Sequence, residues 1–118
     1  MATSMNLSFP ESDLAVLTLD MPGKGANILS RPILEELSVN LDRLEERGDL
    51  AGLVITSAKP GIFIAGADLR EFLSSLDAPD EAIVDKCVLG QKLFQRLSEV
   101  PFITVAAIDG ICVGGGAE

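Results

Sequence analysis

The sequence predicts an α/β domain with parallel strands. The prediction depends on three apolar runs, Leu14–Met21, Gly52–Ser57 and Phe102–Ile108, which alternate with segments of helical periodicity. Strands and helices that alternate in this order pair in parallel through right-handed crossovers. The chain has 118 residues, which is enough for one domain at most, and 47% of them are apolar, which is sufficient for a core.

An amphipathic helix is expected after the first strand. Pro22–Gly25 breaks the strand, Ser30 is a candidate N-cap, and Pro32 is tolerated in the first helical turn. Gly48 ends the helix. The apolar stripe of this helix consists of Ile33, Leu34, Leu37, Leu41 and Leu44. Its acidic residues are expected to form a solvated face: Glu35, Glu36, Asp42, Glu45 and Glu46.

Two further helices are expected between the second and third strands. The second strand, Gly52–Ser57, is a continuous apolar run, typical of a strand buried on both faces. Asp68 can cap a short helix, and Pro79-Asp80 opens a longer one that ends at Val100-Pro101. The short helix runs through Leu69, Phe72, Leu73 and Leu76, and the inner side of the long helix is expected to carry Ile83, Cys87, Leu89, Gly90, Leu93, Phe94 and Leu97.

The composition excludes several classes of function. Acidic residues outnumber basic ones 18 to 9, for a net charge of −9, and such a surface repels nucleic acid and anionic membranes. The absence of His excludes a Ser-His-Asp triad, a Cys-His dyad and a HExxH zinc motif. Cys87 and Cys112 match no metal or redox spacing, so we expect two buried free thiols, a reducing compartment and no metal site.

The amino terminus shows no targeting signal. MATSMNLSFPES lacks the basic and apolar regions of a signal peptide, and it has no Arg of the kind found in organelle transit peptides. The apolar runs fall short of the roughly 20 residues that a membrane span needs. We therefore expect a soluble, cytoplasmic protein.

Two glycine segments follow predicted strands, where ligands bind in parallel α/β sheets. Gly61–Gly66 has the spacing of a P-loop, but Ala67-Asp68 stand where Lys and Ser/Thr are required, and Gly110–Gly116 lacks the GxGxxG spacing. Backbone amides of Gly114–Gly116 and Ala65–Asp68 could instead converge on one oxygen as an oxyanion hole. The residues alone leave open whether the glycines serve this purpose or only tight packing.

Glu118 lies three residues after Gly115, about one helical turn. Its carboxylate could therefore reach the pocket that the Gly115 amide faces. A Glu near the start of a helix can also be an ordinary capping residue. Both interpretations stay open on the residues alone.

The segments Ser57–Leu69 and Ala106–Glu118 resemble the two signature segments of the crotonase (enoyl-CoA hydratase/isomerase) superfamily. The stretch Leu19–Leu29 is similar as well, and the resemblance is strongest to the hydratase domains of multifunctional fatty-acid oxidation proteins. It implies a crotonase-like ββα spiral that forms trimers. Residues 1–118 would then be one partial domain, the N-terminal half, truncated after the Gly-Gly-Gly-x-Glu segment and with one side of its sheet uncovered.

The same resemblance implies the site residues. The amides of Ala67 and Gly115 would hold the thioester oxygen, and Glu118 would be one of two catalytic carboxylates, the second lying beyond residue 118. Coenzyme A is part of the substrate, so no separate cofactor is expected. The residues expected to contact the CoA thioester are Lys59, Ala65, Gly66, Asp68, Leu69, Arg70 and Gly114.

The resemblance implies an enoyl-CoA hydratase of fatty-acid β-oxidation, which adds water to a 2-trans-enoyl-CoA. Its partners would be the acyl-CoA substrate and either identical subunits, in a trimer-based oligomer, or a multienzyme complex. Three alternatives stay open: a Δ3-Δ2 enoyl-CoA isomerase, a CoA-thioester hydrolase, and a non-catalytic CoA-binding or assembly module.

Overall fold

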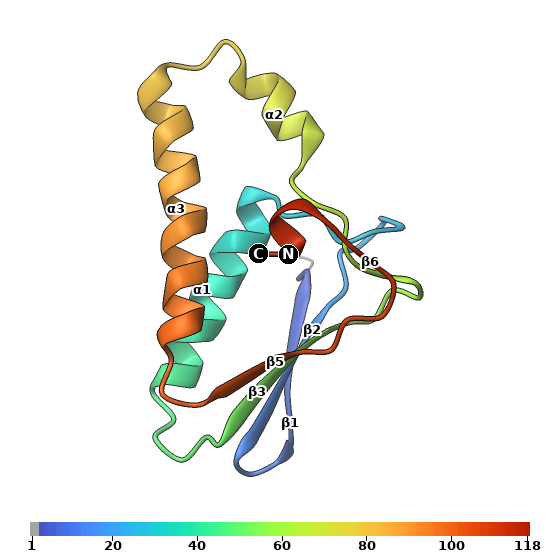
Figure 1. Ribbon diagram of the computed structural model, residues 1–118, viewed down its shortest axis with the longest axis vertical. Coiled ribbons are helices and arrows are strands. Elements are labelled where there is room, and N and C mark those ends of the chain that lie inside the picture. Colours follow the sequence, from blue (N-terminus) through green and yellow to red (C-terminus); the bar gives the residue numbers. More distant parts are fainter. Residues whose placement is uncertain (1–2) are drawn as a thin grey trace.

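A computed structural model describes residues 3–118 of the chain. Its main feature is a four-stranded sheet in the order β1-β2-β3-β5, with the helices α1 and α3 packed together on one side of it (Figure 1). The molecule is elongated, 47 × 30 × 27 Å. The strands of this sheet are β1 (Met5–Glu11), β2 (Leu14–Leu19), β3 (Gly52–Ser57) and β5 (Ile103–Ala106).

A second, two-stranded sheet lies beyond the carboxyl ends of the main strands and consists of β4 (Ile62–Ile64) and β6 (Ile111–Cys112). The helices are α1 (Arg31–Glu45), α2 (Leu69–Ser75) and α3 (Asp80–Glu99), and the chain closes on a 3₁₀ turn, η1 (Gly114–Gly116). None of the helices among residues 3–118 is long and apolar enough to cross a membrane.

The predicted parallel arrangement is confirmed. β2 pairs in parallel with β3, and β3 pairs in parallel with β5. The antiparallel strand β1, which pairs with β2 at the sheet edge, was missed. Its residues are mostly exposed and include Pro10, and its register shifts between Ser8 and Glu11. Proline and irregular register are tolerated at an edge, but they remove the alternating pattern that would have predicted a strand.

The helix α1 begins as the sequence predicts, but it ends at Glu45 with Glu46 as its C-cap, before the predicted end at Gly48. The Ser30 hydroxyl accepts a hydrogen bond from the Ile33 amide at 3.4 Å, and Pro32 lies in the first turn. All five predicted apolar residues of α1 are buried. They pack against the inward side of β2, where Ala15, Leu17 and Leu19 alternate with half-buried residues. This contact is the centre of the core.

The burial on both faces that was expected for β3 is wrong, and β5 is also uncovered. In β3 only Leu53 is buried, and every residue of β5 is exposed, including Ile103 at 72%. The helices cover one side of the sheet, and β5 is an edge strand among the described residues. The sheet therefore has an uncovered apolar side, as the resemblance to a partial domain implied.

The inner side predicted for α3 is confirmed only over its second half. Leu93 is buried, and Leu89, Phe94 and Leu97 pack partly against the core, but Ile83 and Cys87 are exposed. The first half of α3 and all of α2 extend beyond the sheet as an arm (Figure 1). No strand among residues 3–118 therefore covers the apolar side chains of α2, and none of them is buried.

The prediction of two buried thiols is therefore wrong for Cys87, which is exposed. Cys112 is half-buried, and its thiol donates a long hydrogen bond to the Gly116 carbonyl at 3.4 Å. Both cysteines are free thiols in the structure.

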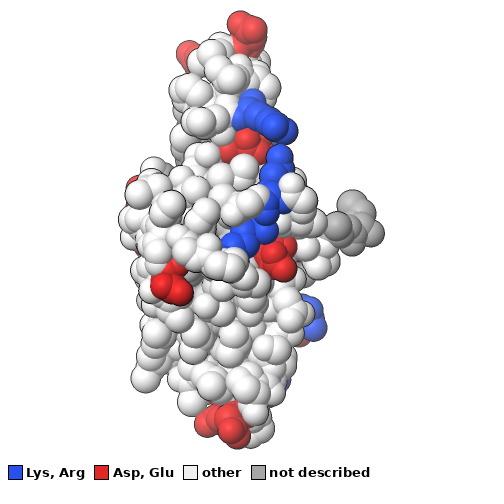
Figure 2. Space-filling model, turned by 90° about the vertical axis from the view of Figure 1, so that its right-hand side faces the viewer, with Lys and Arg blue, Asp and Glu red and all other residues white. Residues whose placement is uncertain are grey.

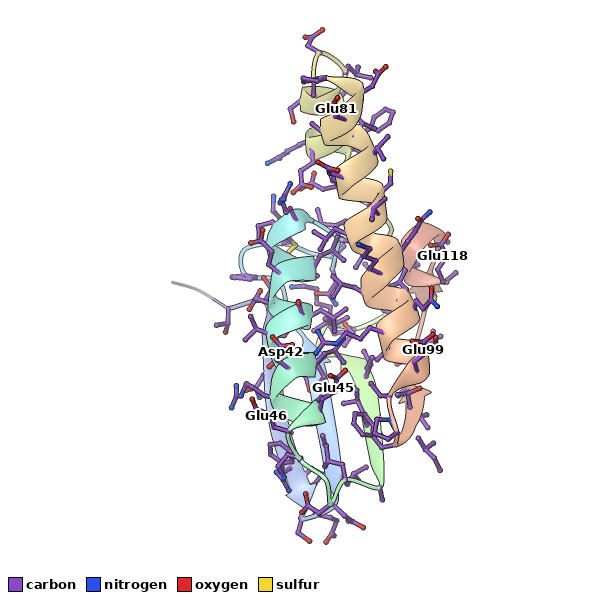
Figure 3. The ribbon with its side chains drawn as sticks, turned by 90° about the vertical axis from the view of Figure 1, so that its left-hand side faces the viewer. Asp42, Glu45, Glu46, Glu81, Glu99 and Glu118 are labelled. Carbon is purple, nitrogen blue, oxygen red and sulfur yellow. The ribbon has the colours of Figure 1, made fainter. Side chains whose placement is uncertain are left out.

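Arg96 of α3 ties the two long helices together. Its guanidinium donates to the Asp42 carboxylate at 2.6 Å and to the Glu45 carboxylate at 2.8 Å, both on the side of α1 that faces α3 (Figure 3). The hydrogen bond from Arg96 holds the pKa of Glu45 below its ordinary value of 4.5. The predicted acidic face of α1 is thus solvated except at Glu36, which is half-buried and accepts from the Ser4 amide at 2.9 and 3.0 Å. Asp42 and Glu45, although exposed, also bind α3.

We predict that Glu45→Gln lowers stability at neutral pH and matters progressively less in acid. Because the folded-state pKa of Glu45 is depressed, its contribution is present above the unfolded-state pKa and lost as pH falls through the folded pKa. Glu45 is partly exposed, so salt should weaken the effect. Urea unfolding between pH 3 and 7 measures it.

The control for this prediction is Glu46→Gln, which makes the same chemical change where no ion pair exists among residues 3–118. A loss from Glu45→Gln that is independent of pH, or equal to that of Glu46→Gln, would contradict it.

Candidate active site

The parallel pairing of β4 with β6 brings the two glycine segments to one place. Ile62 pairs with Ile111 and Ile64 with Cys112, and the Val113 amide donates to the Ile64 carbonyl at 3.2 Å. Because the two strands are parallel, their carboxyl ends lie at the same edge. In Figure 1 the η1 turn accordingly lies beside the link between β4 and α2, and η1 contacts β4.

Gly66 and Gly114 allow the two segments to touch. Both have positive φ angles, +116° and +58°, which side chains other than glycine rarely adopt. A Cβ on Gly114 would lie 3.4 Å from the Gly66 Cα, so the two backbones are in van der Waals contact. The glycines were predicted to permit close packing or close contact with a ligand. In the structure, Gly66 and Gly114 permit the two glycine segments to contact each other.

Gly116 and Gly115 have different neighbours. A Cβ on Gly116 would lie 2.6 Å from the Ile64 Cβ and 2.9 Å from the Ile64 carbonyl oxygen, so Gly116 serves tight packing. A Cβ on Gly115 would meet only the Cδ1 atom of Leu29, at 2.7 Å, which is the flexible end of a side chain. The packing interpretation thus accounts for Gly116 and leaves Gly115 unexplained.

The amide of Ala67 is left out of the local hydrogen-bond ladder. Ala67 forms an isolated parallel bridge with Leu29. The two hydrogen bonds of this bridge join Leu29 to the two neighbours of Ala67, and not to Ala67 itself. The Leu29 amide donates to the Gly66 carbonyl at 2.7 Å, and the Leu29 carbonyl accepts from the Asp68 amide at 3.4 Å. Among residues 3–118, no acceptor bonds the Ala67 amide, and Ala67 is exposed.

The amide of Gly115 is also unpaired. The η1 turn is closed by the Gly116 amide, which donates to Val113, and by the Ala117 amide, which donates to Gly114. The first amides of any such turn have no internal partner. Within the described part of the chain, the Gly115 amide has no acceptor either. Two unpaired amides therefore occur on the two segments that β4 and β6 hold together.

Glu118 lies three residues after Gly115 and is exposed. In Figure 3 the Glu118 side chain lies apart from Asp42 and Glu45 of α1 and from Glu46, which directly follows that helix. Among residues 3–118, its carboxylate has no hydrogen-bond or ion-pair partner that would make it a structural cap. The helix-face acids are therefore not part of this site.

Lys59 lies on the segment expected to bind CoA, but its ammonium group has structural partners. It donates to the Met21 and Lys24 carbonyls at 2.8 and 2.6 Å and to the Asp20 carboxylate at 3.2 Å, and its side chain is only 11% exposed. An ammonium group has three donors, and all three are used. A phosphate would have to displace one of these bonds or interact at longer range.

The other expected CoA contacts lie around the start of α2. Asp68 is the N-cap, and its carboxylate accepts from the Arg70 amide at 2.9 Å. Leu69 is 75% exposed, and the Arg70 guanidinium has no ion-pair partner among residues 3–118. The face that carries β4 and β6 shows a row of Lys and Arg side chains that runs down its upper half, with Asp and Glu side chains beside it (Figure 2). Local basic charge thus exists despite the net charge of −9.

The sequence analysis missed Asn27 as a site-supporting residue. Asn27 is 1% exposed, and its side chain bonds groups of Leu19, Met21, Ser57 and Phe63. The available signal was a polar residue directly before the apolar pair Ile28-Leu29, in a stretch without helical or strand periodicity. Its partners lie as many as 36 residues away, so local patterns could not identify them.

Two surface grooves lie elsewhere and contain none of the predicted site residues. One lies between the ends of α1 and α3 and includes Arg96 and Pro101, and the other lies between β1 and α1 and includes Met5 and Val39. No group of three or more Cys, Asp or Glu side chains among residues 3–118 is arranged to hold a metal ion.

The fold and the paired glycine segments define a known class of protein. A family model described as enoyl-CoA hydratase/isomerase matches residues 10–118, and the chain belongs to this family. The predicted crotonase-like α/β fold is thereby confirmed. The division into one partial domain stays a prediction.

Individual relatives agree with this assignment. The chain is 43% identical over 110 residues to the fatty acid oxidation complex subunit alpha of Aliivibrio fischeri, and 43% identical over 116 residues to the protein of that name from Vibrio cholerae serotype O1. The alignments cover 92% and 98% of this chain but only 16% of each relative.

Solved structures share the fold. An enoyl-CoA hydratase from Bacillus anthracis superposes with a TM-score of 0.83 at 26% identity, over 97% of this chain and 43% of that one. An enoyl-CoA hydratase from Shewanella pealeana superposes with a TM-score of 0.87 over 97% of this chain and 42% of that one, and at 18% identity it supports the fold alone.

We predict that Gly116→Ala destabilises the chain by about 1–3 kcal/mol, as overpacking in a filled region does. The cause is the contact with the Ile64 backbone and Cβ. Gly115→Ala is the matched comparison, because only the mobile end of Leu29 has to move, and it should cost clearly less. Urea unfolding of both variants provides the comparison, and equal losses would contradict the packing described here.

Proposed function

We propose that these residues form part of the active site of an enoyl-CoA hydratase, which adds water to a 2-trans-enoyl-CoA in fatty-acid β-oxidation. The observation that carries the proposal is the pair of unpaired amides, Ala67 and Gly115, on two strand ends that are held in contact. Membership of the hydratase/isomerase family and the exposed Glu118, three residues after the second amide, support it.

The two amides would act on the thioester carbonyl. When an oxygen nucleophile adds at C3, negative charge moves through the conjugated system to the thioester oxygen, as an enolate. Two N–H groups at that oxygen would stabilise the charge, and a donor of this kind contributes roughly 3–4 kcal/mol to the transition state. The ground-state carbonyl carries less charge, so the stabilisation is greatest in the transition state.

Glu118 would transfer a proton in this reaction. Addition of water forms a C3–O bond and a C2–H bond, so one proton leaves the attacking water and one proton reaches C2. A carboxylate beside the thioester can take or return such a proton. The family resemblance implies a second carboxylate, further along a hydratase chain, for the other transfer.

Substrate binding would use backbone groups and local basic charge. We propose that Ala65, Gly66 and Gly114 provide the surface against which the thioester lies, and that Asp68 and Leu69 border it. Arg70, which lacks an ion-pair partner among the described residues, is the better placed of the two cations to meet a CoA phosphate. Lys59 would contribute at longer range, because its donors are engaged.

Assembly and location are proposed on the relatives. Two relatives are named as subunits of a fatty acid oxidation complex, which favours a multienzyme complex. A trimer-based oligomer and a cytoplasmic location are proposed on the family resemblance and the sequence alone. Light scattering of the natural polypeptide would decide between these states.

We predict that Glu118→Gln in the natural polypeptide lowers kcat for crotonyl-CoA hydration by about 100- to 10,000-fold, the usual contribution of a positioned acid or base. Binding of the thioester should survive because the amides are unchanged. The matched control is Glu46→Gln, the same chemical change on the exposed face of α1. Rates of hydration are followed by loss of the enoyl absorbance.

The result also separates the alternatives. Retained hydration in Glu118→Gln would reject the assignment of Glu118. A wild-type protein that moves the double bond of a 3-enoyl-CoA, or releases free CoA, without hydration would identify an isomerase or a hydrolase. Binding without any turnover would identify a non-catalytic CoA-binding module.

A further inference from the structure

We propose that Asn27 is a positioning residue for the two-amide site: its buried side chain fixes the segment that aligns the Ala67 amide. This inference rests on the proposed function, because it assigns Asn27 a role in catalysis through the backbone of residues 65–68. Asn27 would not touch the substrate. Its effect would be to keep the first amide at the place where the thioester oxygen binds.

The side chain of Asn27 joins three strands. Its Oδ1 atom accepts from the Met21 amide at 3.0 Å, just past the end of β2. Its Nδ2 atom donates to the Ser57 hydroxyl at 2.8 Å, at the last residue of β3, and to the Phe63 carbonyl at 3.0 Å, in β4. A weaker contact of 3.4 Å reaches the Leu19 carbonyl. One buried amide thus fixes β4 relative to the main sheet.

The backbone that follows Asn27 carries this placement to the site. The Asn27 carbonyl accepts from the Ala65 amide at 2.8 Å, and Leu29 exchanges hydrogen bonds with Gly66 and Asp68. Residues 27–29 therefore run alongside residues 65–68 and form hydrogen bonds with Ala65, Gly66 and Asp68. Ala67 lies opposite Leu29 in this bridge, and its amide takes no part in these bonds.

The same segment reaches the second amide. The end of the Leu29 side chain lies where a Cβ on Gly115 would project, at 2.7 Å. Residues 27–29 thus contact both amide-bearing segments, one by hydrogen bonds and one by packing. A shift of this segment would move the two amides relative to each other, and a displacement of about 1 Å at a reacting group can cost about 100-fold in rate.

The test compares Asn27→Ala with Leu41→Ala in the natural polypeptide. Leu41 is fully buried in α1 and forms no contact with residues 65–68 through hydrogen bonds, so its loss destabilises the core without releasing the site. We expect Asn27→Ala to lower kcat for crotonyl-CoA by about 10- to 100-fold with little change in KM. We expect Leu41→Ala, assayed where it is folded, to keep the wild-type kcat.

A spectroscopic measurement distinguishes positioning from general destabilisation. Bound cinnamoyl-CoA absorbs at longer wavelength when its thioester carbonyl is polarised, so the red shift reports on the two amides. The shift should shrink in Asn27→Ala and persist in Leu41→Ala. If Asn27→Ala does not fold, Ser57→Ala, which removes the 2.8 Å bond from Nδ2 together with the 3.0 Å bond from the Lys59 amide, should show smaller changes in the same direction.

The inference would be overturned by a folded Asn27→Ala, or failing that a folded Ser57→Ala, with the kcat and red shift of the wild type. A wild-type protein without hydration and without a red shift would reject the proposed function, and the inference with it. These results therefore distinguish failure of the positioning role of Asn27 from failure of the proposed function.

Discussion

The parallel pairing of β4 with β6 is the constraint on which the candidate site depends. These two short strands place Gly66 against Gly114, and the contact is close because neither residue carries a side chain. The unpaired amides of Ala67 and Gly115 each lie one residue beyond these glycines. If the pairing slipped by one residue, the two amides would no longer occupy adjoining positions, and Gly116 would lose its place against Ile64.

The main sheet and α1 support this pair from below. The core between β2 and α1 fixes the carboxyl ends of the strands, and the buried amide of Asn27 connects those ends to β4. Lys59 provides a second connection, between the 20–24 loop and the end of β3. Its ammonium group binds the loop, and its backbone amide donates to the Ser57 hydroxyl. The polar groups beneath the site are therefore engaged in structure, and the amides at its surface are left free for a ligand.

Local patterns predicted the helices and the three parallel strands of the main sheet, whereas β1, β4 and β6 and the contacts between distant residues were not predicted. The stripe of α1 and its Ser30 cap depend on neighbours within one or two turns, so the sequence predicts them well. Edge strand β1 has no such pattern, and the exposure of Cys87 depends on what packs beyond the sheet. The glycine spacing indicated close approach, but only the register of β4 and β6 identifies which glycines meet. Asn27 was missed for the same reason.

The central claim is that the Ala67 and Gly115 amides bind a thioester oxygen. It is tested most directly by ¹³C NMR of the natural polypeptide with a saturated acyl-CoA labelled at the thioester carbonyl. The account predicts a downfield shift of this resonance on binding, and loss of that shift in Ala67→Pro, which removes one N–H donor. A bound thioester whose resonance is unshifted, or equally shifted in folded Ala67→Pro, would contradict the account.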